Sequence, residues 1–227
     1  NDWSEKVVST LQAAEKNYRD VIQKSLEHFA GPVFRDEIFS AKTEFFENSG
    51  ILDENAPNYE LRMSQFFDWY FFTRDLKGFG QTPLESLFNT RELRFSPEEI
   101  VVIDRLKSHR HGLYEFIKMK GSDIYLKDLL RNDKIVVRES PYRSGFNPDE
   151  LFEARLLPFE DTWIFTKGFC FHPVDARKFI LSEVKRHRKD NDLNPDDLML
   201  ALVKMRYRAE RYRHVRVETI YSFDNKG

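Results

Sequence analysis

The pattern of apolar residues changes twice along this 227-residue chain, and the change restricts its fold more than any other feature. In residues 1–108 apolar side chains recur every three or four positions, which is typical of helices with one buried face. Between residues 109 and 172 they fall into short runs separated by turn-forming residues. Helical spacing then returns. The sequence therefore predicts an α+β fold: an N-terminal helical module, a small SH3-like or OB-like β-barrel, and C-terminal helices.

Helix boundaries are marked clearly in the first module. The helical pattern over residues 4–30 ends at Gly31-Pro32, because proline cannot continue a helix. A second helix is expected over residues 35–47. Thr82-Pro83-Leu84-Glu85 and Ser96-Pro97-Glu98-Glu99 each combine a capping residue, a first-turn proline and a glutamate, which is typical of a helix start.

The predicted barrel consists of short strands rich in β-branched and aromatic residues. They are expected over residues 113–119, 124–126, 135–139, 151–157, 162–166 and 169–171. Two helices should follow, over residues 174–188 and from the Asn194 cap to about residue 212. Residues 215–223 alternate and are expected to form an edge strand. The predicted parts are therefore 1–108, 109–172 and 173–227, packed as one body.

Charge is distributed unevenly, although the net charge is only −2. Residues 1–100 hold 11 Lys/Arg and 18 Asp/Glu, whereas residues 174–227 hold 13 and 9. No apolar run reaches the ~20 residues of a membrane span. The N-terminus lacks the features of a secretory signal, and the single Cys170 allows no internal disulfide. We expect a protein without a membrane span, located in the cytoplasm.

Several residues could carry chemistry, but each has a simpler structural explanation. Asp68 is the only polar residue between positions 66 and 72 of an expected central helix over 59–74, and we expect it to cap backbone or to pair with Arg62 or Arg74. The His109–His111 and Cys170–His172 pairs lack the further ligands or orienting groups that a metal site or nucleophile needs. We therefore expect no catalytic residue, cofactor or metal site.

Two sets of residues are candidates for binding a partner. On the barrel they are cations and aromatic residues: Arg138, Tyr142, Arg143, Arg155 and Trp163. On the last long helix, Lys204, Arg208 and Arg211 follow at i, i+4 and i+7 and form one basic stripe. This stripe could bind an acidic protein surface, nucleic acid or anionic lipid, or dock on the acidic helical module of the same chain.

Several phrases occur together in a recognisable order. They are Phe67-Asp68-Trp69, Thr82-Pro83-Leu84-Glu85, Ser96-Pro97-Glu98-Glu99, Leu126-Lys127-Asp128-Leu129-Leu130 and Ala154-Arg155-Leu156-Leu157-Pro158. In this order the chain resembles a loosely defined group of uncharacterised bacterial proteins over roughly residues 35–185. Some members end in a SEC-C zinc-binding motif, whose cysteine cluster is absent here, so no zinc site is implied. The resemblance implies that the helical module and the barrel form one unit.

Together these features predict a non-catalytic binding or adaptor protein. The expected partner is a protein, engaged through the barrel loops and the basic C-terminal helix. The alternative is a nucleic-acid-binding module that stacks bases on barrel aromatics and follows phosphates with barrel cations. A third hypothesis, a nucleotide-signal receptor, would use Arg138 and Arg143, whose spacing is one residue longer than in the arginine pair of PilZ barrels. The oligomeric state is left open.

Overall fold

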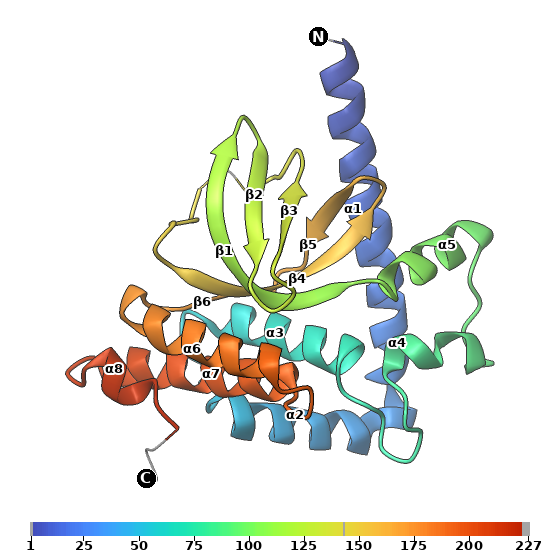
Figure 1. The fold of residues 1–227 in the computed structure, drawn as a ribbon. Helices are drawn as coiled ribbons and strands as arrows, with labels where there is room; N and C mark the ends of the chain where they lie inside the picture. The colour runs from blue at the N-terminus through green and yellow to red at the C-terminus, as the bar shows by residue number, and fades with distance from the viewer. Residues whose placement is uncertain (1, 143, 224–227) are drawn as a thin grey trace.

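The computed structural model describes residues 2–142 and 144–223, with side chains from residue 10 onward. A curled antiparallel sheet forms a half-barrel above a layer of helices, and the long first helix runs beside both (Figure 1). The predicted α+β class, with helices at both ends of the chain and β-structure between them, is confirmed.

The N-terminal part is helical as predicted. Its α-helices are α1 Asp2–Phe29, α2 Arg35–Ser49, α3 Tyr59–Phe72, α4 Pro83–Ser86 and α5 Pro97–Leu106, with 3-10 turns at Pro32–Phe34 and Leu87–Asn89. Both expected capping boxes form. The Thr82 hydroxyl accepts from the Glu85 N–H and the Ser96 hydroxyl from the Glu99 N–H, while each glutamate accepts from the N–H of its capping residue.

Helix α3 occupies the centre of the helical part, as its apolar sequence predicts. Phe66, Tyr70 and Phe71 are fully or almost fully buried, and the rings of Phe66 and Tyr70 stack. The Tyr70 hydroxyl donates to the carbonyl of Phe29 at 2.7 Å, which satisfies the one polar atom of that ring and ties α3 to the end of α1.

All six predicted strands are present. They are β1 Arg110–Lys120, β2 Asp123–Asp128, β3 Asp133–Val137, β4 Leu151–Phe159, β5 Thr162–Phe165 and β6 Cys170–Phe171. The sheet order is β3-β2-β1-β4-β5, with β6 also paired to β4, and every pairing is antiparallel. Register shifts between Phe116 and Lys118, where an irregularity interrupts the β1–β2 ladder. Such irregularities bend a strand and help a sheet to curl.

The C-terminal helices are α6 Arg177–Lys189, α7 Pro195–Arg211 and α8 Val217–Ile220, with a 3-10 turn at Val174–Ala176. The predicted edge strand over residues 215–223 is wrong, because α8 lies there. Ile220 and Tyr221 are buried against α6 and α7. The ring of Tyr221 also contacts buried His172, with 2.8 Å between its hydroxyl and Nδ1. Alternation over so few residues fits a single helical turn as well as a strand.

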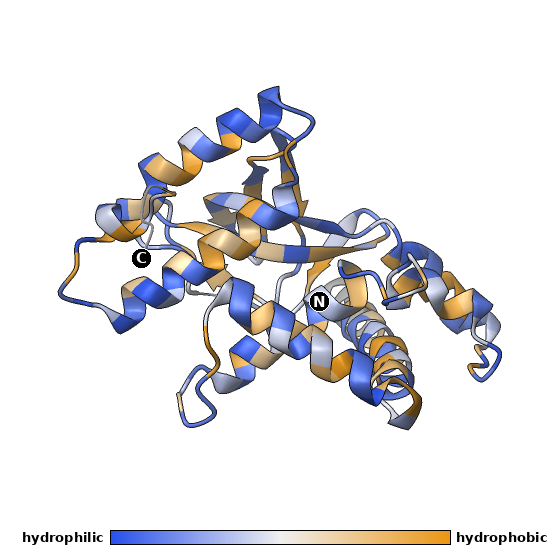
Figure 2. Cartoon of the chain, turned by 90° about the horizontal axis from the view of Figure 1, so that it is seen from below, coloured by the Kyte–Doolittle hydropathy of each residue, from blue (hydrophilic) through white to orange (hydrophobic). Residues whose placement is uncertain are grey.

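The helices and the sheet share their cores. Leu157, Phe159 and Ile164 of the sheet belong to the same buried cluster as the apolar side chains of α1–α5. Leu113 and Leu151 belong to the cluster formed with the C-terminal helices. Figure 2 shows apolar and polar residues alternating along the helices, as burial of one face requires. None of the helices in the described part of the chain is long and apolar enough to cross a membrane.

Candidate functional site

The structure separates the residues predicted to bind a partner into three places. Arg138, Tyr142 and Trp163 lie on different parts of the half-barrel, Arg155 lies in the interior, and the stripe on α7 faces a groove. Arg143 lies outside the described residues.

The candidates on the half-barrel already have partners within the chain. Arg138 lies 3.2 Å from Asp161 and 3.7 Å from Asp123. The guanidinium of Arg110 lies over the Trp163 ring, 5.0 Å from its centroid. Tyr142 packs edge-to-face on Phe165 and Phe169. Each of these three side chains therefore already has a contact within the described part of the chain.

Arg155 occupies the interior between the sheet and the helices, which corrects the expectation that it meets a partner. Only 3% of the residue is exposed. Its Nη2 donates to the Thr73 hydroxyl at 2.8 Å, and its guanidinium lies over the Phe72 ring. Burial lowers the pKa of Arg155. Its Nε and Nη1 have no hydrogen-bond partner among the described residues.

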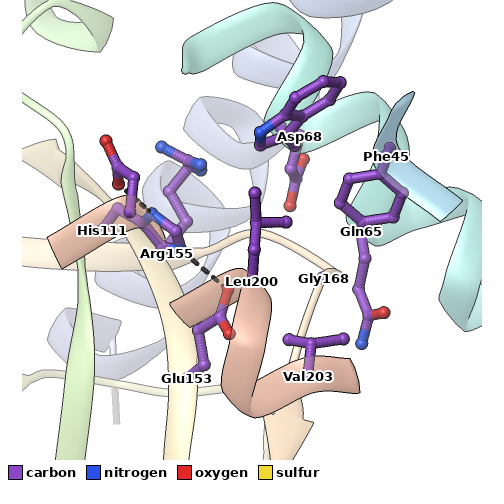
Figure 3. A pocket seen from close by; sticks show the side chains of 11 residues that line it. Phe45, Gln65, Asp68, His111, Glu153, Arg155, Gly168, Leu200 and Val203 are labelled. Atoms are coloured by element: carbon purple, nitrogen blue, oxygen red, sulfur yellow. Dashed lines mark hydrogen bonds and ion pairs between the residues drawn. The ribbon is translucent and has the colours of Figure 1, made fainter. Parts of the chain in front are cut away.

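Four other ionisable side chains converge around Arg155, and we call the five together the buried charge cluster: Asp68 from α3, His111 from β1, Glu153 and Arg155 from β4, and Asp196 from α7 (Figure 3). The two ring nitrogens of His111 face two carboxylates. Nε2 lies 2.7 Å from Glu153 Oε1, and Nδ1 lies 3.2 Å from Asp196 Oδ1. The contact with His111 is the main cause that lowers the pKa of Asp196.

Asp68 binds a backbone N–H, which was one of the two expected alternatives, together with a hydroxyl group. Its Oδ2 accepts from the Thr166 hydroxyl at 2.6 Å, and its carboxylate accepts from the backbone N–H of Gly168. Burial is the largest influence on this carboxyl and raises its pKa, although the charge of Arg155 acts in the opposite direction. The pairing with Arg62 or Arg74 is wrong.

Both of those arginines are occupied elsewhere. Arg62 donates to Gln65 and to the end of α2, and Arg74 binds Glu37 and Glu44. Gly168 leaves no room beside Asp68, since a Cβ at position 168 would lie 2.5 Å from Asp68 Oδ2. The carboxyl of Asp68 is therefore enclosed closely by the segment that follows β5.

The cavity at the buried charge cluster is small, at about 20 Å³. A cavity of this size holds about one water molecule, so the cluster has no room for a substrate in this conformation. No group of three His, Cys, Asp or Glu side chains in the described residues has an arrangement that could hold a metal ion. The cluster connects α3, β1, β4 and α7, and its role in this conformation is to join the sheet to the helices.

The basic stripe lies in an open groove beside α7, which we call the α7 groove. Its volume is about 570 Å³, and Lys204, Arg208 and Arg211 line it as their spacing predicts. Apolar side chains line the same groove: Ile51, Met205, Tyr207, Tyr212 and Phe223. Of these, Ile51 is 80% exposed. The groove thus combines positive charge with accessible apolar surface.

The charge of the α7 groove is only partly compensated within the chain. Lys204 donates to the carbonyl of Glu47 at 3.0 Å, near the C-terminal end of α2, where a cation is favoured by the helix dipole. Arg211 lies against the ring of Tyr212. Neither Arg208 nor Arg211 forms an ion pair with any described residue. Among the residues that the structure describes, no acidic side chain lines the groove, and the described contact of the stripe with the acidic helical module is the backbone contact of Lys204.

Comparison with known proteins places this architecture in a family without giving it a role. No curated protein and no solved structure matches the chain. One family model matches residues 16–215, which is most of the chain, and it describes a family of unknown function (DUF7986). The expectation of an uncharacterised family is confirmed: the chain belongs to the DUF7986 family.

Proposed function

We propose that the protein is a non-catalytic binding protein whose α7 groove takes up an acidic segment of a partner protein. The observation that carries this proposal is the composition of the groove: three cations, accessible apolar side chains and no acid among the described residues that line it. Complementary charge guides a partner to the correct surface and selects it. Accessible apolar side chains supply the contact area that becomes buried on binding.

The apolar surface favours a protein segment over a nucleic acid. Ile51, Tyr212 and Phe223 are all exposed by more than a third, and exposed apolar surface of this kind is typical of protein interaction sites. Proteins that bind nucleic acid chiefly through phosphates present more extended basic surfaces. Nucleic acid is therefore the second candidate partner. The third hypothesis gains no support, because Arg138 is already paired with two aspartates.

The proposal also includes the type of barrel and the cellular compartment. The backbone N–H of Arg138, which follows β3, donates to the Thr162 hydroxyl of β5 at 2.8 Å, and this approach of the outer strands supports an SH3-like or OB-like barrel. The single cysteine, Cys170, is buried and needs no oxidising compartment, which supports a cytoplasmic setting.

Fluorescence anisotropy with labelled peptides tests the proposal. A peptide of about 12 residues that alternates Glu with Leu and Phe should bind, and its affinity should fall as salt is added. A matched peptide with Lys in place of every Glu should not bind. The charge reversal Lys204→Glu/Arg208→Glu/Arg211→Glu should weaken binding of the acidic peptide by about tenfold or more, since each lost ion pair contributes up to ~1 kcal/mol.

A second charge reversal controls for net charge. Lys185→Glu/Arg188→Glu/Lys189→Glu changes three exposed residues at the end of α6 that form no ion pair with a described residue, and it should leave affinity within about twofold. Equal losses in both variants would contradict a site in the α7 groove. Binding of a single-stranded oligonucleotide of about 16 nucleotides, without binding of the acidic peptide, would favour the second candidate.

A further inference from the structure

A second groove lies on the other part of the molecule, between α1, α3 and β5, and we call it the α1 groove. Its volume is about 510 Å³, and it shares no lining residue with the α7 groove. A cavity of roughly 300–1,000 Å³ with mostly apolar walls is typical of a small-molecule site. The size of the α1 groove therefore suits a compact organic ligand.

The walls of the α1 groove are apolar and partly aromatic. Helix α1 contributes Ile22 and Leu26, β5 contributes Ile164, and aromatic rings come from Phe67 and Tyr142. Aromatic faces attract cations as well as apolar groups, because the ring carries negative charge density on its faces.

The charges of the α1 groove are divided by depth. Glu15 and Asp68 are partly buried in it, and burial is the main cause that raises the pKa of each. Arg19, Glu27 and Lys167 also line the groove and are exposed to solvent, which screens their charges. No ion pair joins Glu15 or Asp68 to a described cation, although Arg19 attracts Glu15 and the buried Arg155 attracts Asp68 from the interior.

Asp68 forms part of the groove wall and is held there firmly. Thr166 and the Gly168 N–H bind its carboxylate from the side of β5, with the hydroxyl directed at Oδ2. Asp68 lines both the α1 groove and the cavity of the buried charge cluster. A donor that entered the groove would therefore meet a carboxyl group that is already held in position.

We propose that the α1 groove binds a small organic cation, with its ammonium group at Asp68 and its apolar body against the side chains of α1 and β5. A cation is attracted by the carboxyl groups of Asp68 and Glu15, which line the groove, and burial of the body supplies affinity. This site is independent of the peptide proposed for the α7 groove and goes beyond it, since it assigns the protein a ligand of a different chemical class.

Three probe molecules test the proposal on the full chain. They share a phenyl ring on a four-carbon chain and differ in the charge of the end group. They are 4-phenylbutylamine, 4-phenylbutan-1-ol and 4-phenylbutyrate, titrated by isothermal calorimetry at about pH 7.5, where an alkylamine is protonated like lysine. The amine should bind about tenfold or more tightly than the alcohol and the carboxylate, as expected for a charge-assisted hydrogen bond. Asp68→Asn keeps the shape of the side chain and should remove this preference, leaving the alcohol within about twofold.

Control variants separate the site from general effects. Asp20→Asn removes an exposed carboxylate of α1 that is paired with Lys16 and should leave the amine affinity within about twofold. Ile22→Trp fills the groove from its partly exposed side and should weaken all three probes, so the proposal stays testable even if Asp68→Asn disturbs folding. The charge reversal in the α7 groove should leave amine binding unchanged, which keeps the two proposals distinguishable.

The outcomes are decisive in both directions. A preference for the amine that depends on Asp68 supports the proposal. Equal affinity for the three probes would show an apolar site without charge selection, and tighter binding of the carboxylate would assign recognition to Arg19 or Lys167. Either result, or no binding of the amine at concentrations on the order of 1 mM, overturns the proposal.

Discussion

Arg155 is the residue whose environment differs most from what its position in the chain indicates. It lies in a short predicted strand and was expected to meet a partner, yet the fold encloses it with Asp68 and Glu153 close to it. A buried ion is stabilised only by its neighbours, so removing one member of such a group leaves the others uncompensated. The residues of the buried charge cluster should therefore be strongly coupled in their effect on stability.

Replacement of Arg155 tests this coupling. Arg155→Met keeps most of the side-chain volume but leaves the carboxyl groups without their cation, and it should lower the free energy of unfolding by ~3–5 kcal/mol. Urea denaturation followed by circular dichroism measures the change. Arg138→Met removes a half-exposed arginine with two surface ion pairs and should cost less than ~1 kcal/mol. Similar losses in both variants would contradict the central role of Arg155.

Helix α7 is the element on which most of these contacts depend. Its first turn places Asp196 against His111, its middle places Lys204 on the end of α2, and Arg206 donates to the carbonyl of Phe171 in β6. One helix thus holds the sheet and α2 together while it also presents the basic stripe. A change at the start of α7 should therefore affect the stability of the whole protein and not only that of the helix.

A substitution of the residue that caps α7 tests this expectation. The Asn194 side chain accepts from the Asp196 N–H at 2.9 Å, so Asn194→Ala should destabilise the protein by ~1 kcal/mol or somewhat more. Asn48→Ala is the matched control. Asn48 lies near the end of α2 with its side chain bonded to Glu44, and alanine is favoured inside a helix. Thermal unfolding of the two variants should therefore differ, and an equal shift in Tm would contradict the assigned cap.

At the scale of the whole molecule, the partly buried His109 and the buried His172 link the packing of sheet and helices to pH. His109 and His172 lie between the layers, and burial, the main cause in each case, lowers the pKa of both to about 3. In the unfolded chain they bind protons at about pH 6.5. Between those two values the unfolded state therefore binds more protons than the folded state does.

Stability should accordingly fall as the pH is lowered from about 6.5 towards 3, because protonation then favours the unfolded chain. Urea midpoints at about pH 7, 5.5 and 4.5 should decrease in that order. His109→Gln should flatten the decrease, because one of the two groups no longer titrates, whereas His214→Gln, an exposed control, should not. A profile that is independent of pH in this window would show that His109 and His172 do not control acid stability.

Local sequence was sufficient to predict most elements. Capping at Thr82 and Ser96, the apolar spacing of α3 and the short β-rich runs depend on residues within about four positions of one another, so they can be recognised without a fold. The error at α8 arose where the pattern was too short to distinguish a strand from a helical turn. The basic stripe was also predictable, because it follows from helical spacing alone.

The candidate sites could not be predicted from local sequence, because contacts between distant segments form them. Asp68 meets Thr166, and His111 meets Asp196, only because the sheet folds over α3 and α7. Glu153 and Arg155, two positions apart on one strand, were the one local signal of a buried charged face. The sequence by itself thus determined the elements and the stripe on α7. Only the tertiary structure decided which charges are buried, because burial and pairing depend on the separation of atoms in space and not on their order in the chain.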